Sequence, residues 1–454
     1  MSKQRVRIQD ERPVIEKMLF PFNQFVKIES SGGVVLILCT VVALIWANST
    51  FAHFYENFKN IPLTVGVGKF VLSKPAILWI NDGLMVVFFF LVGLEIKREV
   101  LVGELNSLRQ ASLPICAAVG GMVVPALTYA YFNHGTPSAA GWGIPMATDI
   151  AFSLGILSLL GDRVPISLKI FLTAIAIVDD IGAILVIAVF YSTGVSLWMI
   201  GVGLLFLLLM FMLNRMGVRA PLPYLILGVF MWLAFLKSGV HATVAGVLAA
   251  MSIPASTTTC CNKFTFSIRK SLSDYEVAVG DSAVTLSNKQ MLSSLSEMHN
   301  DIMMASPPLK RIEHSLHYYV AFAIMPIFAL ANAGISFSAD AGGSGLDIFH
   351  PVSIGIFLGL IAGKTIGICL ASWLAIKVGI ADSPSTMHRW HFLGAGLLAG
   401  IGFTMSIFIT TLAWGNNAAF VIDAKFSILV ASTVAGLLGF LVLRNCKIGT
   451  NREV

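Results

Sequence analysis

The chain has 454 residues, of which 56% are hydrophobic and only 12% carry charge, and its mean hydropathy is +0.83. Soluble domains typically carry about 25% charged residues, so this composition excludes an ordinary soluble protein and indicates a polytopic membrane protein. In a soluble protein, the net charge of +6 would suggest nucleic acid as a partner. In a membrane protein it is better explained by basic residues in cytoplasmic loops, and we expect no nucleic-acid partner.

About twelve apolar segments follow one another along the chain, which predicts an all-α protein with about twelve transmembrane helices. These segments run near 31–48, 77–96, 112–132, 141–160, 167–191, 196–213, 221–236, 239–254, 312–334, 351–376, 390–413 and 424–443. An even number of spans places both termini on one side of the membrane. Most of the 30 Lys and Arg residues then lie on that same side, so both termini are predicted to be cytoplasmic.

The domain organisation follows from these segments and from the polar stretches between them. We expect an N-terminal tail (1–30), helices one to eight (31–254), a polar insert (255–310), helices nine to twelve (311–443) and a C-terminal tail (444–454). Within the first tail, residues 13–28 are predicted to lie as an amphipathic segment on the inner membrane surface. The insert is interpreted as a solvated linker, with a regulatory role as the alternative, and the outer loop 49–76 is expected to contain a short strand pair.

Two adjacent carboxylates, Asp179 and Asp180, lie in the middle of an apolar run from Ser167 to Tyr191. Each charged side chain at the bilayer centre costs roughly 2.5–3.5 kcal/mol on insertion scales. Such a pair is tolerated when the helix faces a polar cavity and a proton, a cation or a basic side chain neutralises it. The sequence therefore predicts an ion site at this position.

Two further ionisable residues, Asp149 and Lys364, lie near the middle of their own segments. Four charged side chains at one depth indicate a binding site at the membrane centre, where secondary transporters place theirs. A buried salt bridge such as Lys364 with Asp179 is the structural alternative, but it leaves two carboxylates over. Adjacent helical residues point about 100° apart, so one aspartate can pair with Lys364 while the other faces a cavity.

Glycine and proline interrupt the fourth and eleventh segments, in residues 141–149 and 394–406. Broken helices at membrane depth expose dipole ends and unpaired carbonyls that must line protein or water. If the two breaks meet, Asp149 would neutralise the half-helix N-termini and Lys364 the C-termini. Close helix packing through small residues is the alternative interpretation.

A second ionisable group is predicted at the cytoplasmic rim of the bundle. Its members are Glu95, Lys97, Arg98, Glu99, Lys310, Arg311, Glu313, His314 and His317. Rim charges are ordinarily solvated anchors, yet acids, bases and histidines at one funnel mouth can titrate near neutral pH and gate it. His241 begins the eighth segment on the outer side, where an interfacial histidine is one interpretation and a pH-responsive group is the other.

Several motifs, long and in the same order, resemble the NhaA sodium/proton antiporters. The similarity covers roughly residues 28–255 and 308–445. The motifs that carry it are Trp79–Glu99 (with Phe-Leu-Val-Gly-Leu-Glu-Ile-Lys-Arg-Glu), Ala147–Phe152, Leu168–Ala183 (with Val-Asp-Asp-Ile-Gly-Ala), Leu236–Thr243 and Gly400–Ser406. This family is itself a known example of the transporters built from inverted repeats. The longer N-terminal tail and insert are the departures, and they bear on the set point of pH regulation rather than on the ion chemistry.

The resemblance implies a fold and a set of roles for individual residues. It implies twelve helices, with the third to fifth related to the tenth to twelfth by inverted topology, and with the fourth and eleventh unwound where they cross. Asp179 and Asp180 would bind the cation and the proton, and Lys364 would pair with the first of them. Thr148 and Asp149 would lie beside the crossing. The remaining matches form the family's pH-response cluster, namely Glu95, Arg98, Glu99, Glu313 and His317.

The sequence thus predicts an electrogenic secondary antiporter that exports Na⁺ and Li⁺ in exchange for H⁺. Burial and a neighbouring carboxylate both favour the neutral form of a carboxyl group, so the pair can release protons when a hard cation binds. We expect no enzymatic activity and no cofactor. The protein is expected to lie in the bacterial inner membrane, in contact with lipid, and a homodimer is possible. A cation channel or another cation-coupled transporter is the alternative function. An intramembrane aspartyl protease is excluded, because its aspartates face each other from separate helices.

Overall fold

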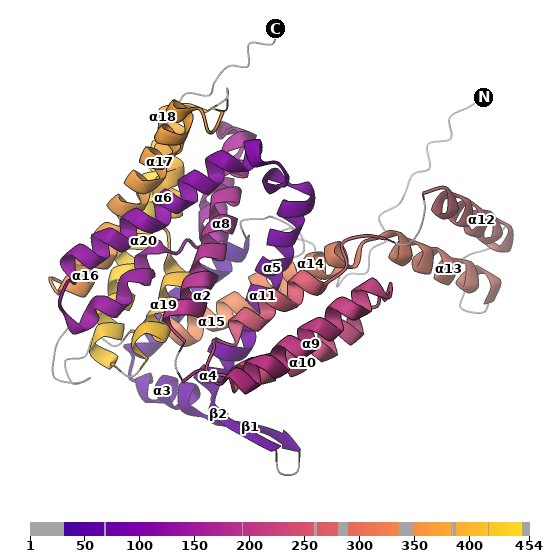
Figure 1. Ribbon diagram of the computed structural model, residues 1–454, viewed down its shortest axis with the longest axis horizontal. Coiled ribbons are helices and arrows are strands. Elements are labelled where there is room, and N and C mark those ends of the chain that lie inside the picture. Colours follow the sequence, from indigo (N-terminus) through magenta and orange to yellow (C-terminus); the bar gives the residue numbers. More distant parts are fainter. Residues whose placement is uncertain are drawn as a thin grey trace, which may run out of the picture.

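The computed structural model describes residues 31–446 apart from 68–69, 193, 258–260, 280–288, 336–347, 383, 385–386 and 416. Within these residues the chain forms a helical bundle with one small two-stranded sheet (Figure 1). The predicted helical membrane fold is confirmed. The amphipathic segment 13–28 and most of the C-terminal tail lie outside the described residues.

The predicted apolar segments coincide with helices. Among the described residues, seven helices are long and apolar enough to cross a membrane, or up to ten if each bent pair is one span. Two shorter apolar helices, α10 (Pro221–Leu236) and α11 (Thr243–Ser252), complete the set. The first half also contains α2 (Ser31–Ala47), α3 (Ala52–Asn60), β1 (Pro62–Val67), β2 (Phe70–Pro75), α4 (Ala76–Trp79), η1 (Ile80–Leu84), α5 (Met85–Val102), η2 (Glu104–Asn106), α6 (Leu108–Phe132), η3 (Pro137–Met146), α7 (Ile150–Leu159), η4 (Gly161–Arg163), α8 (Ile166–Phe190) and α9 (Leu197–Arg215). The second half contains α12 (Cys261–Val279), α13 (Lys289–Ala305), α14 (Pro308–Tyr319), η5 (Val320–Ile324), α15 (Met325–Asn332), α16 (Pro351–Leu358), η6 (Gly359–Gly363), α17 (Lys364–Val378), α18 (Arg389–Ala399), α19 (Phe403–Trp414) and α20 (Ala418–Asn445).

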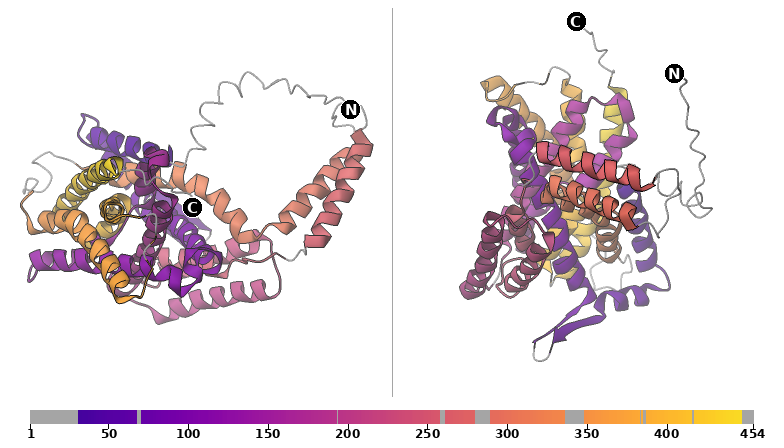
Figure 2. Two further views of the ribbon diagram at one scale, coloured as in Figure 1. Left: turned by 90° about the horizontal axis from the view of Figure 1, so that it is seen from above. Right: turned by 90° about the vertical axis from the view of Figure 1, so that its right-hand side faces the viewer.

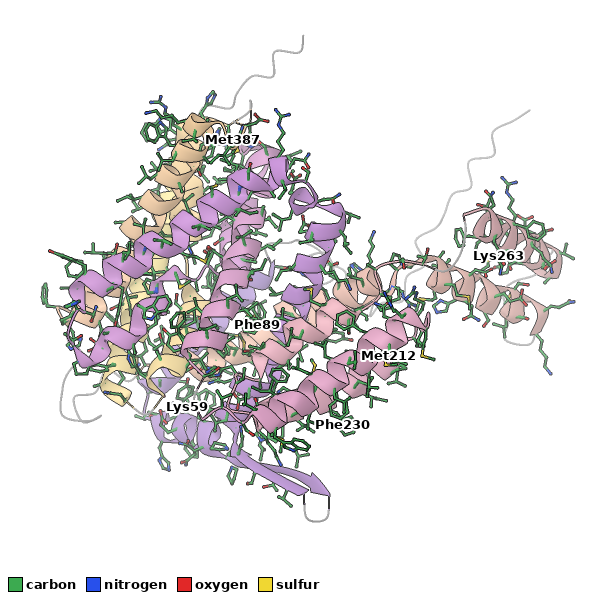
Figure 3. The ribbon with its side chains drawn as sticks, in the orientation of Figure 1. Lys59, Phe89, Met212, Phe230, Lys263 and Met387 are labelled. Atoms are coloured by element: carbon green, nitrogen blue, oxygen red, sulfur yellow. The ribbon has the colours of Figure 1, made fainter. Side chains whose placement is uncertain are left out.

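The membrane-spanning segments are helical because lipid offers no hydrogen-bond partners, so every backbone N–H and C=O needs a partner inside the segment. Their outward faces remain apolar. Met212 on α9 is 54% exposed and Phe230 on α10 is 50% exposed, and both lie on the outside of the bundle (Figure 3). Polar side chains instead collect between the helices, where they form the site described below.

The loop 49–76 contains the predicted strand pair. Strands β1 and β2 are antiparallel, with Pro62 opposite Pro75. The sheet is tied to the first turns of the following helix by an ion pair between Lys74 Nζ and Asp82 Oδ2 at 2.9 Å.

The insert contains helices that were not predicted. Its described residues form two helices, α12 and α13, which pack together and project from the bundle (Figures 1 and 2). The Ser267 hydroxyl on α12 lies 2.5 Å from Asp301 Oδ2 on α13. The insert is therefore helical in these residues, and its role as a linker or a regulatory element stays a prediction. Apolar side chains such as Phe264, Ile268 and Tyr275 recur at helical spacing in the insert. This pattern was overlooked because most residues around these side chains are polar.

Two spans are broken as predicted. Helices η3 and α7 meet at a bend of 40°, and helices α18 and α19 meet at a bend of 44°. In the described part of the chain, three other spans contain a π-helical turn, η1, η5 and η6, and no pattern in the sequence predicted these turns.

Candidate ion-binding site

The two broken helices touch at their breaks. The Asp149 N–H donates to the Ile401 carbonyl at 2.6 Å, so the two interrupted backbones are hydrogen-bonded to each other. Two hydroxyl groups add further bonds: Ser153 donates to the Leu398 carbonyl and Ser406 donates to the Ile144 carbonyl, each at 2.8 Å. The predicted meeting of the fourth and eleventh segments is thus observed.

Asp149 lies at the start of two half-helices. Its Oδ1 accepts the Phe152 N–H at 3.1 Å, which caps α7. Its Oδ2 accepts the Thr404 N–H at 3.1 Å and also the Thr404 hydroxyl, both in the first turn of α19. One buried carboxylate therefore meets two positive helix ends, the position expected for it. Thr404 was missed as a site residue, although it follows directly on the Gly400–Gly402 break.

Lys364 pairs with Asp179, as predicted. Its side chain is fully buried, and Nζ lies 2.5 Å from Asp179 Oδ2. The same ammonium donates to the carbonyl of Met146, the last residue of η3, so it also meets a helix C-terminus. The Thr148 hydroxyl lies 2.6 Å from Asp179 Oδ2 and 2.9 Å from the Ala399 carbonyl. A hydroxyl carries one proton, so Thr148 donates to one of these acceptors at a time.

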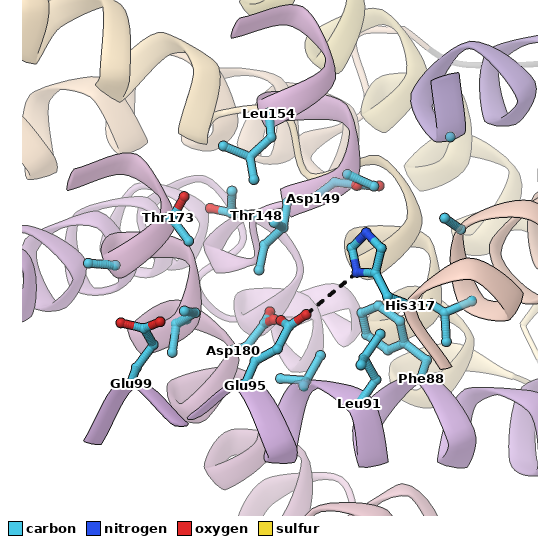
Figure 4. Close-up of a pocket in the computed structure, with 18 of the residues that line it drawn as sticks. Phe88, Leu91, Glu95, Glu99, Thr148, Asp149, Leu154, Thr173, Asp180 and His317 are labelled. Atoms are coloured by element: carbon cyan, nitrogen blue, oxygen red, sulfur yellow. Dashed lines mark ion pairs between the residues drawn. The ribbon is translucent and has the colours of Figure 1, made fainter. Parts of the chain in front are cut away.

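Asp180 is the carboxylate that is left over. It is 1% exposed, and within the described part of the chain its Oδ2 has no hydrogen-bond partner, nor has Oδ1 of Asp179. Asp180 lines a cavity of about 700 Å³ together with Thr148, Asp149 and Thr404 (Figure 4). Buried polar atoms are rarely left without partners. Unpaired carboxylate oxygens beside a hydroxyl group form a donor set that suits a proton or a hard cation.

Five of the predicted rim residues line this cavity, namely Glu95, Arg98, Glu99, Glu313 and His317, whereas Lys310, Arg311 and His314 do not line it. Arg98 pairs with Glu99 at 2.9 Å and also with Glu313. His317 Nδ1 lies 3.9 Å from Glu95 Oε1, the pair marked by a dashed line in Figure 4. Five residues from two distant parts of the sequence are thus brought together where the cavity opens.

Lys97 and His241 have partners elsewhere in the bundle. Lys97 points away from the mouth and donates to the carbonyls of Met251 and Ile253, at 2.6 Å each, at the end of α11. His241 Nε2 lies 2.8 Å from the Tyr191 carbonyl, beyond the far end of α8. That helix has 25 residues, about 37 Å of length, and Lys169 near its start already lines the cavity. The structure therefore does not bring His241 to the rim cluster, as its predicted outer position implies.

Sequence reasoning also missed a buried amide pair. Asn332 Nδ2 on α15 donates to Asn81 Oδ1 in η1 at 2.8 Å, and to the Phe328 carbonyl at 3.1 Å. The two asparagines lie 251 positions apart, so only their proximity in space shows that they are partners.

The fold and the site together define a class: multi-pass helical membrane proteins with a carboxylate site at the crossing of two broken helices. A family model described as Na⁺/H⁺ antiporter 1 matches residues 23–443. The chain therefore belongs to the Na⁺/H⁺ antiporter 1 family, the family of the NhaA antiporters.

Curated relatives cover nearly the whole chain. The Na⁺/H⁺ antiporter NhaA of Oleidesulfovibrio alaskensis is 52% identical over 430 residues, 95% of each chain. The NhaA of Koribacter versatilis is 46% identical, over 96% of this chain and 94% of its own length. NhaA 1 of Saccharophagus degradans is 45% identical, over 94% of this chain and 92% of its own.

Proposed function

We propose that the protein is an electrogenic antiporter that exports Na⁺ and Li⁺ in exchange for H⁺ and whose rate is regulated by pH. Membership of the Na⁺/H⁺ antiporter 1 family and the names of the relatives support exchange of Na⁺ for H⁺. The single observation that carries the assignment of the site is the buried Asp180 carboxylate, which lines a cavity and has an oxygen without a partner among the described residues.

The two aspartates have different duties in this proposal. Asp180 faces the cavity and binds the cation or a proton in turn. Asp179 is held by Lys364 and Thr148, and its Oδ1, which lacks a partner among the described residues, is the second proposed ligand atom. Removal from water and a neighbouring carboxylate favour protonation, so an entering cation competes with protons for the same oxygens. Two carboxylates allow more than one proton to move per cation, which makes the exchange electrogenic.

The crossing provides the moving part. Asp149 and Lys364 neutralise the helix ends there, so the broken helices can shift without leaving bare dipole ends in the membrane. Alternate exposure of one site to the two sides is sufficient for exchange. The five rim residues that line the cavity are Glu95, Arg98, Glu99, Glu313 and His317. A change of charge there alters the local cation concentration and biases the gate.

The proposed location is the bacterial inner membrane, with the rim, the insert and both termini on the cytoplasmic side. The support is the excess of Lys and Arg in the tails and loops of that side. The cavity then opens to the cytoplasm, the side from which Na⁺ is exported.

The test uses purified protein in liposomes that carry a pH gradient and a fluorescent pH indicator. Addition of Na⁺ or Li⁺ should dissipate the gradient, K⁺ should not, and the rate should respond to membrane potential. A cation channel, the alternative function, would let Na⁺ through without coupled proton movement. Na⁺ flux that leaves the pH gradient intact would contradict the proposal.

A further inference from the structure

The residue before Lys364 ends a π-helical turn. The span that carries Lys364 consists of α16, the turn η6 (Gly359–Gly363) and α17, and the Lys364 N–H donates to the Gly359 carbonyl five residues earlier. A turn of this kind is rare and accommodates one more residue than an α-helical turn, and it often lies at functional sites.

The turn decides where the Lys364 side chain points. Each residue of an α-helix advances about 100° around the axis. The same five residues wound as a regular helix would carry Lys364 roughly a quarter of a turn further round. Lys364 Nζ would then face away from Asp179 Oδ2, which now lies 2.5 Å from it, and from the Met146 carbonyl.

The turn is also wedged against the crossing. A Cβ atom on Gly359 would lie 2.7 Å from Cβ of Pro145, in η3, and one on Gly363 would lie 3.0 Å from Cα of Pro125, in α6. On the other side, Gly400 in the second break lies against the Leu360 carbonyl. The wide turn thus touches both broken segments and ends at the lysine that binds one of them.

We propose that η6 is a positioning element that aims Lys364 at Asp179 and at the end of η3, with Gly359 and Gly363 as its positioning residues. The inference deepens the proposed antiport and rests on it. Because the turn joins the crossing to Lys364, a shift of the crossing changes the Lys364–Asp179 contact directly. Gly359 and Gly363 then act through Lys364, and not only by filling space.

A double-mutant cycle separates these two roles. The variants are Gly359→Ala, Lys364→Gln and the two combined, measured by thermal unfolding in detergent. Gly355→Ala is the matched control: it lies one turn earlier on α16, and its Cβ would meet Asn133 Nδ2 at the same distance, 2.7 Å, away from the crossing. Residues in contact shift each other's unfolding equilibrium by roughly 2- to 160-fold, whereas the effects of independent sites add.

If η6 aims Lys364, Gly359→Ala destabilises the parent more than it destabilises the Lys364→Gln protein, while Gly355→Ala costs the same in both. Gly359→Ala also moves the pH of half-maximal exchange, whereas Gly355→Ala leaves it in place. Additive effects for both glycines, with an unchanged pH profile, would overturn the inference and leave η6 a packing feature. Gly363→Ala, which is less crowded, replaces Gly359→Ala if the latter does not fold.

The cycle does not depend on transport. Additivity in a protein that still exchanges Na⁺ for H⁺ would overturn the positioning role alone. If the parent protein shows the coupling but does not exchange Na⁺ for H⁺, the positioning role holds and the proposed function is contradicted.

Discussion

Replacement of Lys364 by alanine gives the sharpest prediction on stability. Lys364 is 0% exposed and Asp179 is 1% exposed, so the variant leaves a buried carboxylate with the Thr148 hydroxyl as its remaining donor among the described residues. It also removes the ammonium from the Met146 carbonyl. Breaking a buried ion pair by removing one partner costs about 3–5 kcal/mol, and we expect a loss of that order for Lys364→Ala.

The matched control is Lys377→Ala on the same helix, α17. Lys377 is exposed, and its Nζ lies over the Trp373 ring at 4.6 Å, a contact worth about 0.5–1 kcal/mol at an exposed site. The assay is thermal unfolding of the two variants and the parent, purified in the same detergent. Asp179→Asn added to Lys364→Ala should restore part of the loss, because the stranded charge is gone. A melting temperature for Lys364→Ala no lower than that of Lys377→Ala would refute the reasoning.

Three further predictions concern Thr404, Glu313 and the α12–α13 pair. Thr404→Val removes the hydroxyl that donates to Asp149, so we expect lower stability and slower exchange, with Thr411→Val, whose hydroxyl donates to the Phe408 carbonyl of its own helix, as the control. Glu313→Gln alters the charge beside Arg98 and should move the pH of half-maximal exchange without abolishing it; curves that overlay the parent at saturating and limiting Na⁺ would assign the pH response to the aspartates alone. Replacement of residues 258–305 by a short Gly-Ser linker should leave rate and pH profile nearly intact, because the α12–α13 pair projects from the bundle, and a displaced pH profile would show that the pair is regulatory.

Much of the fold was predictable because lipid leaves the chain few choices. Apolar length gives the spans, and glycine with proline in residues 141–149 gives one of the breaks. The Lys364–Asp179 pair was also predictable, since a charge at the membrane centre needs an opposite charge near it. The α12–α13 pair was not predicted, because few apolar residues recur at helical spacing among its many polar residues.

Other parts of the site depend on contacts between distant segments. The bond from Thr404 to Asp149 joins residues 255 positions apart, and no single-sequence pattern connects them. The sequence does not predict the π-helical turn η6 either, because Gly359 and Gly363 also fit the pattern of small residues at an ordinary helix contact. Hydrophobic spacing identifies the helices, whereas which side chains meet between them follows only from how the helices pack.

The proposed exchange of protons for Na⁺ at Asp180 is tested most directly by one variant. Asp180→Asn keeps the shape of the side chain but cannot bind or release the proton, and Asp382→Asn, on an exposed residue paired with Arg109, is the control. Both are reconstituted in liposomes, and proton movement on addition of Na⁺ is recorded. The proposed mechanism predicts loss of Na⁺-dependent proton movement in Asp180→Asn and normal movement in Asp382→Asn. Near-normal exchange by folded Asp180→Asn would contradict it.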